Sequence, residues 1–321
     1  MATHQTYKTK VICAQEDGAI KAAVENLIAG HLVAVPTETV YGLAADAHNP
    51  EALQLIYKVK GRPANNPLIC HVADTQMAKR YVEVSGLTEK LMREFWPGPL
   101  TFVLPIAGDS EIPSMVSANL GSLAVRCPAN DVTRNVIKNL GRPIAAPSAN
   151  PSGKLSPTSA GDVLEGLGGY IPMVLDGGTA DVGIESTIIG INQHKITLLR
   201  PGTVTAEDIS AAAGEPVFDR HNDEITAPGQ LASHYAPNAA VRLNATQKHD
   251  NETLIGFGAA LGDLTLSKTG DLQEAAHALF ATLRAADKTD CATIAVAPIP
   301  HTGIGIAIND RLKRAAAPRS S

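Results

Sequence analysis

The segment that organises the chain is Lys58-Val59-Lys60-Gly61-Arg62-Pro63-Ala64-Asn65-Asn66-Pro67, followed at once by Leu68-Ile69-Cys70-His71-Val72. Two prolines and a glycine keep the first part from forming a helix, and the apolar run after it is typical of a buried strand. Lys60 and Arg62 are therefore expected on a stiff loop between a helix and a strand. Such a loop suits a polyphosphate, because lysine supplies a point charge and arginine a fork of donors. Cations at a solvated helix C-terminus, where they favour the helix dipole, are the alternative interpretation.

An alternation of helices and strands extends from this stretch in both directions. Upstream, Asn49 and Pro50 predict the start of a helix over 51–59 that leads into the basic loop. Further apolar runs that predict strands fall at residues 10–14, 32–35, 100–104, 123–128, 173–175, 185–189 and 196–200. The alternation of strands and helices resumes after residue 238. Strands are expected at 240–243, 253–257 and 292–297, and helices at 272–286 and 306–316. The pattern predicts an α/β protein.

Composition narrows the class of function. The chain has 321 residues, which is enough for two domains, and 44% of them are hydrophobic, which is enough to bury a core. Its net charge of −5 argues against a protein that holds nucleic acid by bulk electrostatics, so local cations must meet any phosphate ligand. The four cysteines are far apart, and three of them lie in apolar, strand-like runs, which favours small buried hydrophobes over disulfides or zinc ligands. With no apolar signal core and no run of membrane-spanning length, the chain is expected to be cytoplasmic.

Two polar loops follow predicted strands and are candidate ligand sites. The first is Pro36–Leu43, at the carboxyl end of a predicted strand, where open α/β sheets place ligands. The second is Pro147–Thr158, which is rich in hydroxyls and small residues. It is similar to a phosphate-binding loop but is no Walker A motif, because Ser148 and Leu155 stand where glycine and Ser or Thr are needed. An ordinary Ser/Pro loop is the alternative.

Two polar residues interrupt apolar strands. Arg126 lies within Leu123–Pro128, and a buried arginine needs an anion, which can be a ligand or an internal carboxylate. His71 lies in the strand after the basic loop and can be either a hydrogen-bonded core residue or part of a site. The residues themselves leave both alternatives open.

Taken in order, the motifs resemble one family. They are Pro36-Thr37-Glu38-Thr39-Val40-Tyr41-Gly42-Leu43, Lys60-x-Arg62, Asn66-Pro67-Leu68-Ile69 with His71, Ser148-x-Asn150, Glu185-Ser186-Thr187 and Leu199-Arg200-Pro201-Gly202. Together they resemble the YrdC family of threonylcarbamoyl-AMP synthases. The later motifs Ala227-Pro228-Gly229, His234-Tyr235-Ala236-Pro237 and residues 303–312 are similar to the longer, two-domain branch of that family.

The resemblance implies an architecture. It implies a YrdC-like catalytic domain over residues 1–213, an α/β domain whose curved mixed sheet surrounds a concave active site. A linker over 214–238 is expected to cross that site, and residues 239–321 are expected to form a small Rossmann-like α/β domain.

The resemblance also implies a reaction. Such an enzyme joins L-threonine, bicarbonate or CO2, and ATP into threonylcarbamoyl-AMP and pyrophosphate, with Mg2+ expected on the phosphates. The sequence shows no dedicated carboxylate cage, so ATP and water are expected to hold the ion. Other proteins then transfer the threonylcarbamoyl group to tRNA. Weak, salt-sensitive contact with tRNA is compatible with this activity, and no membrane partner is expected.

By the same resemblance, the site residues fall into two sets. Lys60 and Arg62 are the expected catalytic cations. The ATP-binding set is Lys60, Arg62, Asn66, Ser122, Ser148, Asn150, Ser156, Arg200 and Tyr235. The threonine-binding set is Thr39, His71, Arg126, Ala146 and Ser186, in which Arg126 would pair with the threonine carboxylate and Ala146 would act through its backbone.

Two other functions compete with this one. An RNA-binding module without adenylate chemistry could use the same cations, but the acidic net charge and 4% aromatic content disfavour it. Carbamoyltransferases with related domains act from carbamoyl phosphate and carry a zinc finger. The absence of paired cysteine motifs from this sequence argues against that alternative.

Overall fold

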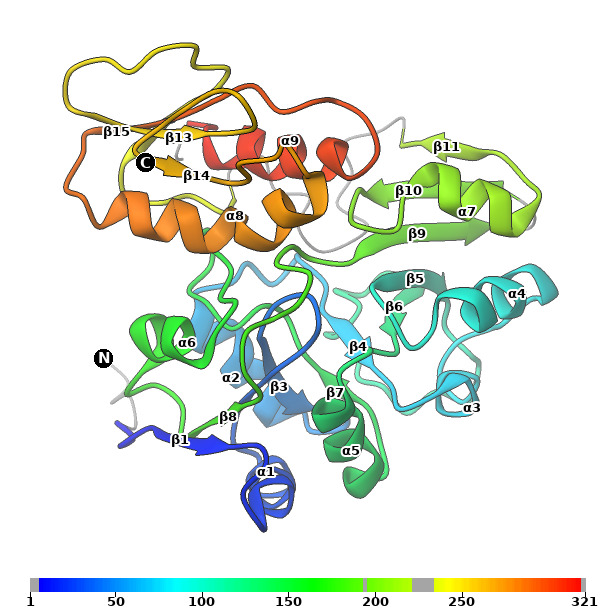
Figure 1. Cartoon of the computed structure of the whole chain (residues 1–321). Helices are drawn as coiled ribbons and strands as arrows, with labels where there is room; N and C mark the ends of the chain where they lie inside the picture. Colours follow the sequence, from blue (N-terminus) through cyan, green and yellow to red (C-terminus); the bar gives the residue numbers. More distant parts are fainter. Residues whose placement is uncertain (1–5, 193–194, 221–233, 319–321) are drawn as a thin grey trace.

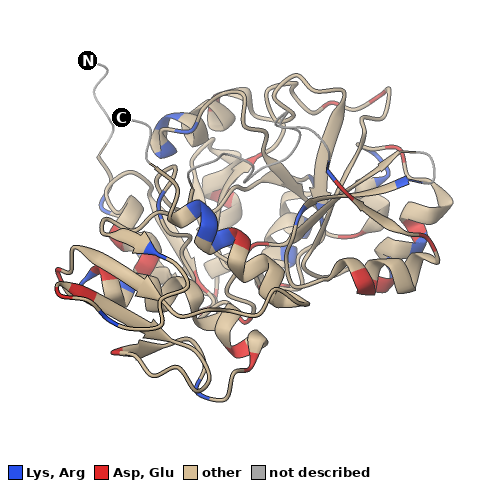
Figure 2. Ribbon diagram, turned by 90° about the horizontal axis from the view of Figure 1, so that it is seen from above, with Lys and Arg blue, Asp and Glu red and all other residues tan. Residues whose placement is uncertain are grey.

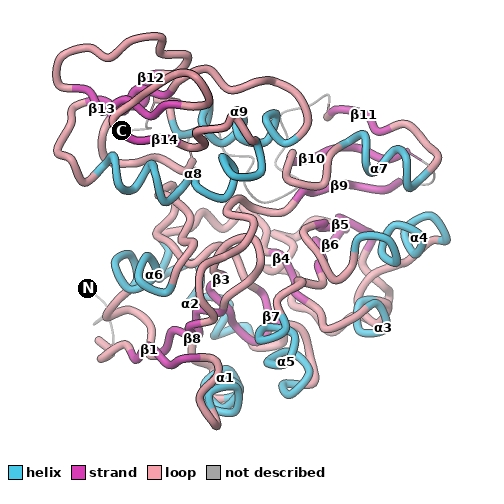
Figure 3. The backbone as a smooth tube through the Cα atoms, viewed as in Figure 1, coloured by secondary structure: helices cyan, strands magenta, loops and turns pink. Residues whose placement is uncertain are grey.

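The computed structural model describes residues 6–192, 195–220 and 234–318 as a large unit and a small unit packed against each other (Figures 1 and 3). The large unit holds an 11-stranded mixed sheet, and the small unit holds a four-stranded sheet. This agrees with the predicted pair of α/β domains. Within the described residues, no helix is long and apolar enough to cross a membrane.

The large unit alternates strands and helices. Its strands are β1 (Lys10–Cys13), β2 (Val33–Val35), β3 (Gly42–Asp46), β4 (Ile69–His71), β5 (Leu100–Pro105), β6 (Ser122–Arg126), β7 (Ile144–Ala145), β8 (Met173–Asp176), β9 (Thr187–Asn192), β10 (Lys195–Arg200) and β11 (Val217–Asp219). Its helices are α1 (Ala19–Ile28), α2 (Pro50–Lys60), α3 (Thr75–Ala78), α4 (Gly86–Phe95), α5 (Asp131–Leu140), α6 (Ala160–Leu167) and α7 (Ala206–Ala213). The strand order is β1-β8-β2-β3-β7-β4-β6-β5-β9-β10-β11, with parallel and antiparallel neighbours mixed.

The small unit is a parallel sheet with two helices. Its elements are β12 (Ala240–Arg242), β13 (Glu252–Gly256), β14 (Leu264–Thr265), α8 (Leu272–Asp287), β15 (Thr293–Val296) and α9 (Ile304–Ala315). The strand order β12-β15-β13-β14 is parallel throughout. Its apolar core also includes Val40, Leu155 and Ile184 of the large unit, so the two units share one packed interface.

The helix that delivers the basic loop begins as predicted but ends one residue later, at Lys60. The Asn49 side chain accepts hydrogen bonds from the backbone N–H groups of Glu51 (3.0 Å) and Ala52 (3.1 Å), and Pro50 follows at the first helical position. Gly61 ends the helix at a φ of 60°, a left-handed conformation that favours glycine. Lys60 was expected on the loop but is the last residue of α2, whereas Arg62 lies beyond the helix end as expected.

Several short elements were not predicted. β3, β7, β11 and β14 have two to five residues each, and β3 is made of glycine, alanine, leucine and aspartate without a β-branched residue. Pairing with β2 and β7 makes β3 a strand, whereas its sequence was assigned in part to a polar loop. β11 pairs with β10 and so extends the large sheet beyond residue 213, where the catalytic domain was predicted to end.

Side chains along the central strands point alternately to two faces of the sheet. One face packs into the main core, and the opposite face, called the site face, carries candidate ligand residues. In β6, Leu123 and Val125 belong to the main core, whereas Ala124 packs with Ile69, Val103 and Ile188 on the opposite face. Ser122 and Arg126 share that second face, because side chains two residues apart point the same way. Candidate ligand residues therefore lie on the sheet face that turns away from the main core.

Candidate active site

One cavity brings together most of the predicted site residues. It is lined by the whole predicted threonine set, Thr39, His71, Arg126, Ala146 and Ser186. It is also lined by four members of the predicted ATP set, Arg62, Ser148, Arg200 and Tyr235. The other lining residues are Thr37, Val40, Gly42, Ile69, Pro147, Glu185 and His234. Two sets assigned separately from the sequence thus meet in one place, although their individual roles stay predictions.

The basic loop is held by backbone carbonyls. Arg62 Nε donates to the Asn66 carbonyl (3.0 Å), and its Nη2 donates to Asn66 Oδ1 and to the Pro67 carbonyl (2.6 Å each). Lys60 Nζ donates to the carbonyls of Ser148 (2.6 Å) and Asn150. Within the described residues, neither cation forms an ion pair with a carboxylate.

Burial of these cations changes their proton affinity. Burial, and then the neighbouring Arg62, lowers the pKa of Lys60 well below its usual value. Burial lowers the pKa of Arg62 to about 10. Burial also lowers the pKa of Arg200, whose Nε and Nη2 donate to the Ser186 carbonyl at 3.1 and 2.9 Å. A group of buried cations with lowered pKa values favours the arrival of an anion.

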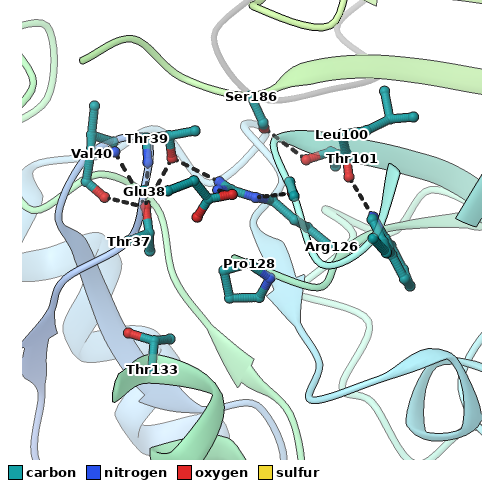
Figure 4. A network of polar contacts seen from close by, with 12 residues as sticks. Thr37, Glu38, Thr39, Val40, Leu100, Thr101, Arg126, Pro128, Thr133 and Ser186 are labelled. Atoms are coloured by element: carbon teal, nitrogen blue, oxygen red, sulfur yellow. Dashed lines mark hydrogen bonds and ion pairs between the residues drawn. The ribbon is translucent and has the colours of Figure 1, made fainter. Parts of the chain in front are cut away.

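The structure gives Arg126 an internal carboxylate partner, and the ligand alternative stays a prediction. Arg126 lines the cavity, and its Nη2 lies 2.7 Å from Oε1 of Glu38, so it is also half of an internal ion pair (Figure 4). Its Nη1 donates to Thr39 Oγ1 (2.9 Å) and its Nε to the Gly98 carbonyl (3.2 Å). Since a guanidinium carries five N–H donors, donors remain for a ligand carboxylate.

The Thr39 hydroxyl belongs to a directed chain of hydrogen bonds. Thr37 Oγ1 donates to the Val40 carbonyl (2.6 Å), so its single proton is committed there. The 2.9 Å contact between Thr39 Oγ1 and Thr37 Oγ1 must then have Thr39 as donor. Thr39 accepts from Arg126 and keeps one lone pair, which fits a ligand N–H or O–H group.

His71 is neutral in this environment. Burial, and then the Arg126 charge, lowers the pKa of His71 to about 3. Its Nδ1 lies 3.2 Å from the Ile69 carbonyl, which can only accept, so Nδ1 carries the proton. Nε2 is consequently a hydrogen-bond acceptor.

The loop that carries Ala146 and Ser148 is positioned by β3. Leu43 N–H donates to the Pro147 carbonyl (2.7 Å), and Ala149 N–H donates to the Tyr41 carbonyl (2.8 Å). A Cβ on Gly42 would lie 3.2 Å from Cβ of Ala146, so glycine allows this close approach. The cavity wall therefore depends on β3, a strand that the sequence analysis missed.

The rest of the predicted ATP set lies outside the cavity lining. Lys60 and Asn150 are linked in the wall behind Ser148, Asn66 holds Arg62, and Ser156 donates to Glu185 Oε1. Ser122 lines a separate cavity over β5, β6, β9 and β10. It stands at the start of β6, whereas Arg126 stands at its end, so three residues of extended chain lie between them.

Glu185 is a cavity residue that the sequence analysis did not assign. Its Oε2 accepts from Arg311 Nε (2.8 Å) of α9, in the small unit. Although burial alone would raise the pKa of Glu185, the Arg311 and Arg200 charges and the Ser156 hydrogen bond lower it. An acidic residue directly before Ser186 was the available signal, but its partner is 126 residues away in sequence.

Tyr235 closes the side of the cavity that faces the small unit. It is 1% exposed, with its ring 5.5 Å from the Phe280 ring and 5.4 Å from the Arg311 guanidinium. Burial raises the pKa of Tyr235 to about 12, so its hydroxyl stays protonated. Residues 221–233 of the predicted linker, including Ala227-Pro228-Gly229, lie outside the described residues.

Both units of the chain match known proteins. The family model Sua5_yciO_yrdC, described as "Telomere recombination", matches residues 25–202, and the model described as "Threonylcarbamoyl-AMP synthase, C-terminal domain" matches residues 204–317. The threonylcarbamoyl-AMP synthase of Pyrococcus abyssi is 38% identical, with 94% of each chain covered. That of Bacillus subtilis is 37% identical, also over 94% of each chain.

A solved structure also matches nearly the whole chain. The crystal structure of P. abyssi Sua5 complexed with L-threonine superposes with a TM-score of 0.88 at 36% sequence identity, covering 96% of this chain and 98% of that one. Both domain models, the near full-length relatives and the shared two-domain fold lead to one conclusion. The chain belongs to the threonylcarbamoyl-AMP synthase family.

Proposed function

We propose that the chain is an L-threonylcarbamoyladenylate synthase, which makes threonylcarbamoyl-AMP and pyrophosphate from L-threonine, bicarbonate or CO2, and ATP. Family membership and the threonine-bound relative support this activity. The observation that carries it is the contact between Arg200, a buried cation suited to phosphate, and Ser186, a member of the predicted threonine set. The two side chains form one wall of the cavity, so a nucleoside triphosphate and an amino acid could meet there.

The chemistry needs alignment more than a reactive protein group. The threonine amine and CO2 form a carbamate, and a carbamate oxygen attacks the α-phosphorus of ATP while pyrophosphate leaves. The nucleophile is already an anion, so no covalent intermediate with the protein is required. The protein must bring two anions together, and positioning of this kind supplies on the order of 7–11 kcal/mol in favourable cases.

Arg62 and Arg200 are the residues that we assign to the phosphates. Both line the cavity, and the burial that lowers their pKa values makes a polyphosphate a favourable partner. Lys60 lies behind Ser148 and holds its carbonyl, so we assign it to the shape of this wall and to the local positive potential. Arg126, Thr39, His71 and Ser186 would then hold threonine at the other side of the cavity.

The adenosine of ATP can extend along the apolar part of the site face of the large sheet. An apolar floor of Ile69, Val103, Ala124 and Ile188, with Leu199 packed against it, occupies the site face of the large sheet. Ile69 also lines the main cavity, whereas Val103 and Leu199 line the cavity that contains Ser122. We assign the base to this floor, which would explain why Ser122 lies apart from the phosphate-binding arginines.

The magnesium ion would bind together with the substrate, as MgATP. Within the described parts of the chain, no group of three or more His, Cys, Asp and Glu residues could hold a metal ion. Glu185 lines the cavity, but Ser156 and Arg311 already occupy its oxygens. We therefore assign the ion to the ATP phosphates and water, with no ligand from the protein.

Pyrophosphate release is the test. Purified protein with MgATP should release pyrophosphate when both L-threonine and bicarbonate are present, and omission of either one should remove the signal. The acyl-adenylate product should be detected by mass spectrometry, because an enclosed site limits its hydrolysis. Release that is indifferent to threonine would overturn the proposal.

The product fits a role before tRNA modification. A threonylcarbamoyl group activated on AMP is ready for transfer to a nucleophile, so we infer that separate transfer proteins consume it on tRNA. Direct RNA binding is the weaker function, because the net charge is −5 and Figure 2 shows Asp and Glu mixed with Lys and Arg over the ribbon. Tight tRNA binding without pyrophosphate release would favour that function instead.

A further inference from the structure

Glu38 is a buried acid to which no role has yet been given. Its side chain is 8% exposed, and neither carboxylate oxygen forms a hydrogen bond with a group other than Arg126 among the described residues. Its one ion-pair partner among them is Arg126, with Oε1 2.7 Å from Nη2. A buried carboxylate without a cation would be strongly unfavourable, so Glu38 depends on Arg126 for its charge balance.

Glu38 lies behind the cavity wall. Its neighbours Thr37 and Thr39 line the cavity, as does Arg126, whereas Glu38 does not. The carbonyl of Glu38 accepts from the Val182 N–H (2.7 Å), which fixes this part of the loop. Figure 4 shows the carboxylate beside the Arg126 guanidinium, next to Thr39. Any effect of Glu38 on a ligand must therefore pass through Arg126 and through the electrostatic field.

Charge balance then determines which ligand fits. Glu38 and Arg126 form a pair with no net charge, and His71 beside them is neutral because its pKa is lowered to about 3. A ligand carboxylate that binds Arg126 leaves two carboxylates sharing one guanidinium. The surplus negative charge is compensated if the same ligand brings its own cation, as the α-ammonium group of an amino acid does.

We propose that Glu38 is a specificity-determining positioning residue, which holds Arg126 and makes the pocket select its substrate as a zwitterionic amino acid rather than as a simple carboxylate. This inference rests on the proposed function, since it presumes that threonine binds at Arg126. It extends that function by naming Glu38 as the residue that makes binding depend on the charge of the ligand as well as on its shape.

The test compares two ligands that differ in the ammonium group. L-Threonine and (R)-3-hydroxybutyrate share the carboxylate and the hydroxyl, but the second lacks the amine. Isothermal titration calorimetry on the full chain measures both dissociation constants and hence their ratio. The wild-type protein should bind threonine more tightly by at least about 10-fold.

The Glu38→Gln variant should reduce this ratio. Without the carboxylate, Arg126 is an uncompensated cation, so the simple carboxylate should bind more tightly and the zwitterion less tightly. The ratio should fall by about 10-fold or more, whereas a merely structural loss would weaken both ligands alike. Glu38→Asp keeps the charge and should keep most of the ratio. An unchanged ratio in Glu38→Gln overturns the role of Glu38.

A matched control lies in the small unit. Glu252 is equally buried, with a side chain 7% exposed, and pairs with Arg242. Glu252→Gln should leave the ligand ratio unchanged, and a change there would show that the ratio reports general destabilisation and would overturn the inference.

Further outcomes keep the two proposals apart. A wild-type protein that binds threonine and hydroxybutyrate equally refutes the role of Glu38, even if Glu38→Gln does not fold. A wild-type protein that binds no threonine, and releases no pyrophosphate in its presence, refutes the proposed function itself.

Discussion

The basic loop and the junction between the two units both bury arginine, with opposite consequences. Arg62 in the basic loop is 8% exposed and is held by carbonyl groups, and burial lowers its pKa to about 10. Arg311 at the junction is fully buried. Burial alone would lower its pKa too, but Tyr235, Glu185 and Asp310 raise it.

This difference separates a ligand site from a structural contact. A buried cation whose hydrogen bonds go to neutral carbonyls still has its full charge available for an anion. Arg311 contacts two carboxylates, which compensate its charge inside the protein, and its loss leaves both of them uncompensated. Arg311 therefore connects the small unit to the rear of the cavity through Glu185, while Arg62 faces the cavity itself.

The largest expected effect is on stability at the junction. Arg311→Met should lower the free energy of unfolding by about 3–5 kcal/mol, because Glu185 and Asp310 lose a buried cation. Urea denaturation measures this. The double variant Arg311→Met with Glu185→Gln should recover part of the loss, since one buried charge is then also removed. A single variant as stable as the wild type would show that the junction does not depend on this pair.

The next effect is on turnover at the basic loop. Lys60→Ala and Arg62→Ala should each lower kcat/KM for pyrophosphate release by about 100- to 1,000-fold, because the phosphates lose preorganised positive charge. Circular dichroism should show a retained fold. Lys58→Ala, an exposed lysine of the same helix, is the control and should stay close to wild type. Near wild-type rates in both loop variants would remove the phosphate role assigned to this segment.

A ligand-binding test distinguishes the two regions directly. Pyrophosphate at 100 times its dissociation constant should raise the free energy of unfolding of the wild type by about 2.7 kcal/mol, seen as a higher Tm. Arg62→Met should lose this stabilisation, whereas Arg311→Met should keep it from a lower starting Tm. Equal loss in both variants would mean that the two regions are not functionally distinct.

The smallest effect concerns pH. The pKa of His71 is about 3 in the folded chain, against an ordinary value of 6.5, so below about pH 6 the unfolded chain binds a proton that the folded chain does not. Stability should therefore fall with decreasing pH. His71→Gln should reduce this dependence by about 1.4 kcal/mol per pH unit between about pH 6 and about pH 4.

Urea denaturation across that range measures the slope. His301→Gln, at an exposed position, is the control and should leave the slope unchanged. An unaltered slope in His71→Gln would contradict the neutral, buried state assigned to His71.

Local sequence was sufficient for the basic loop. Asn49, Pro50 and Gly61 are capping and terminating residues whose effect operates within one or two helical turns, so the start and end of α2 could be predicted from adjacent residues. The periodicity of apolar residues likewise predicted the strands around the site and the helix α8. The predicted threonine set was assigned by family resemblance, and all five of its members line one cavity.

Long-range contacts account for what the sequence analysis missed. β3 is a strand because β2 and β7 pair with it, and it positions the loop that carries Ser148. The partners Glu38 and Arg126 are 88 residues apart, and no local pattern shows that one carboxylate neutralises this guanidinium. The sequence by itself determined the helices, the strand propensities and the chemistry that the side chains can provide. The tertiary structure decided which charges are compensated inside the protein and which remain for a ligand, because Coulomb interactions depend on distance in space and on burial.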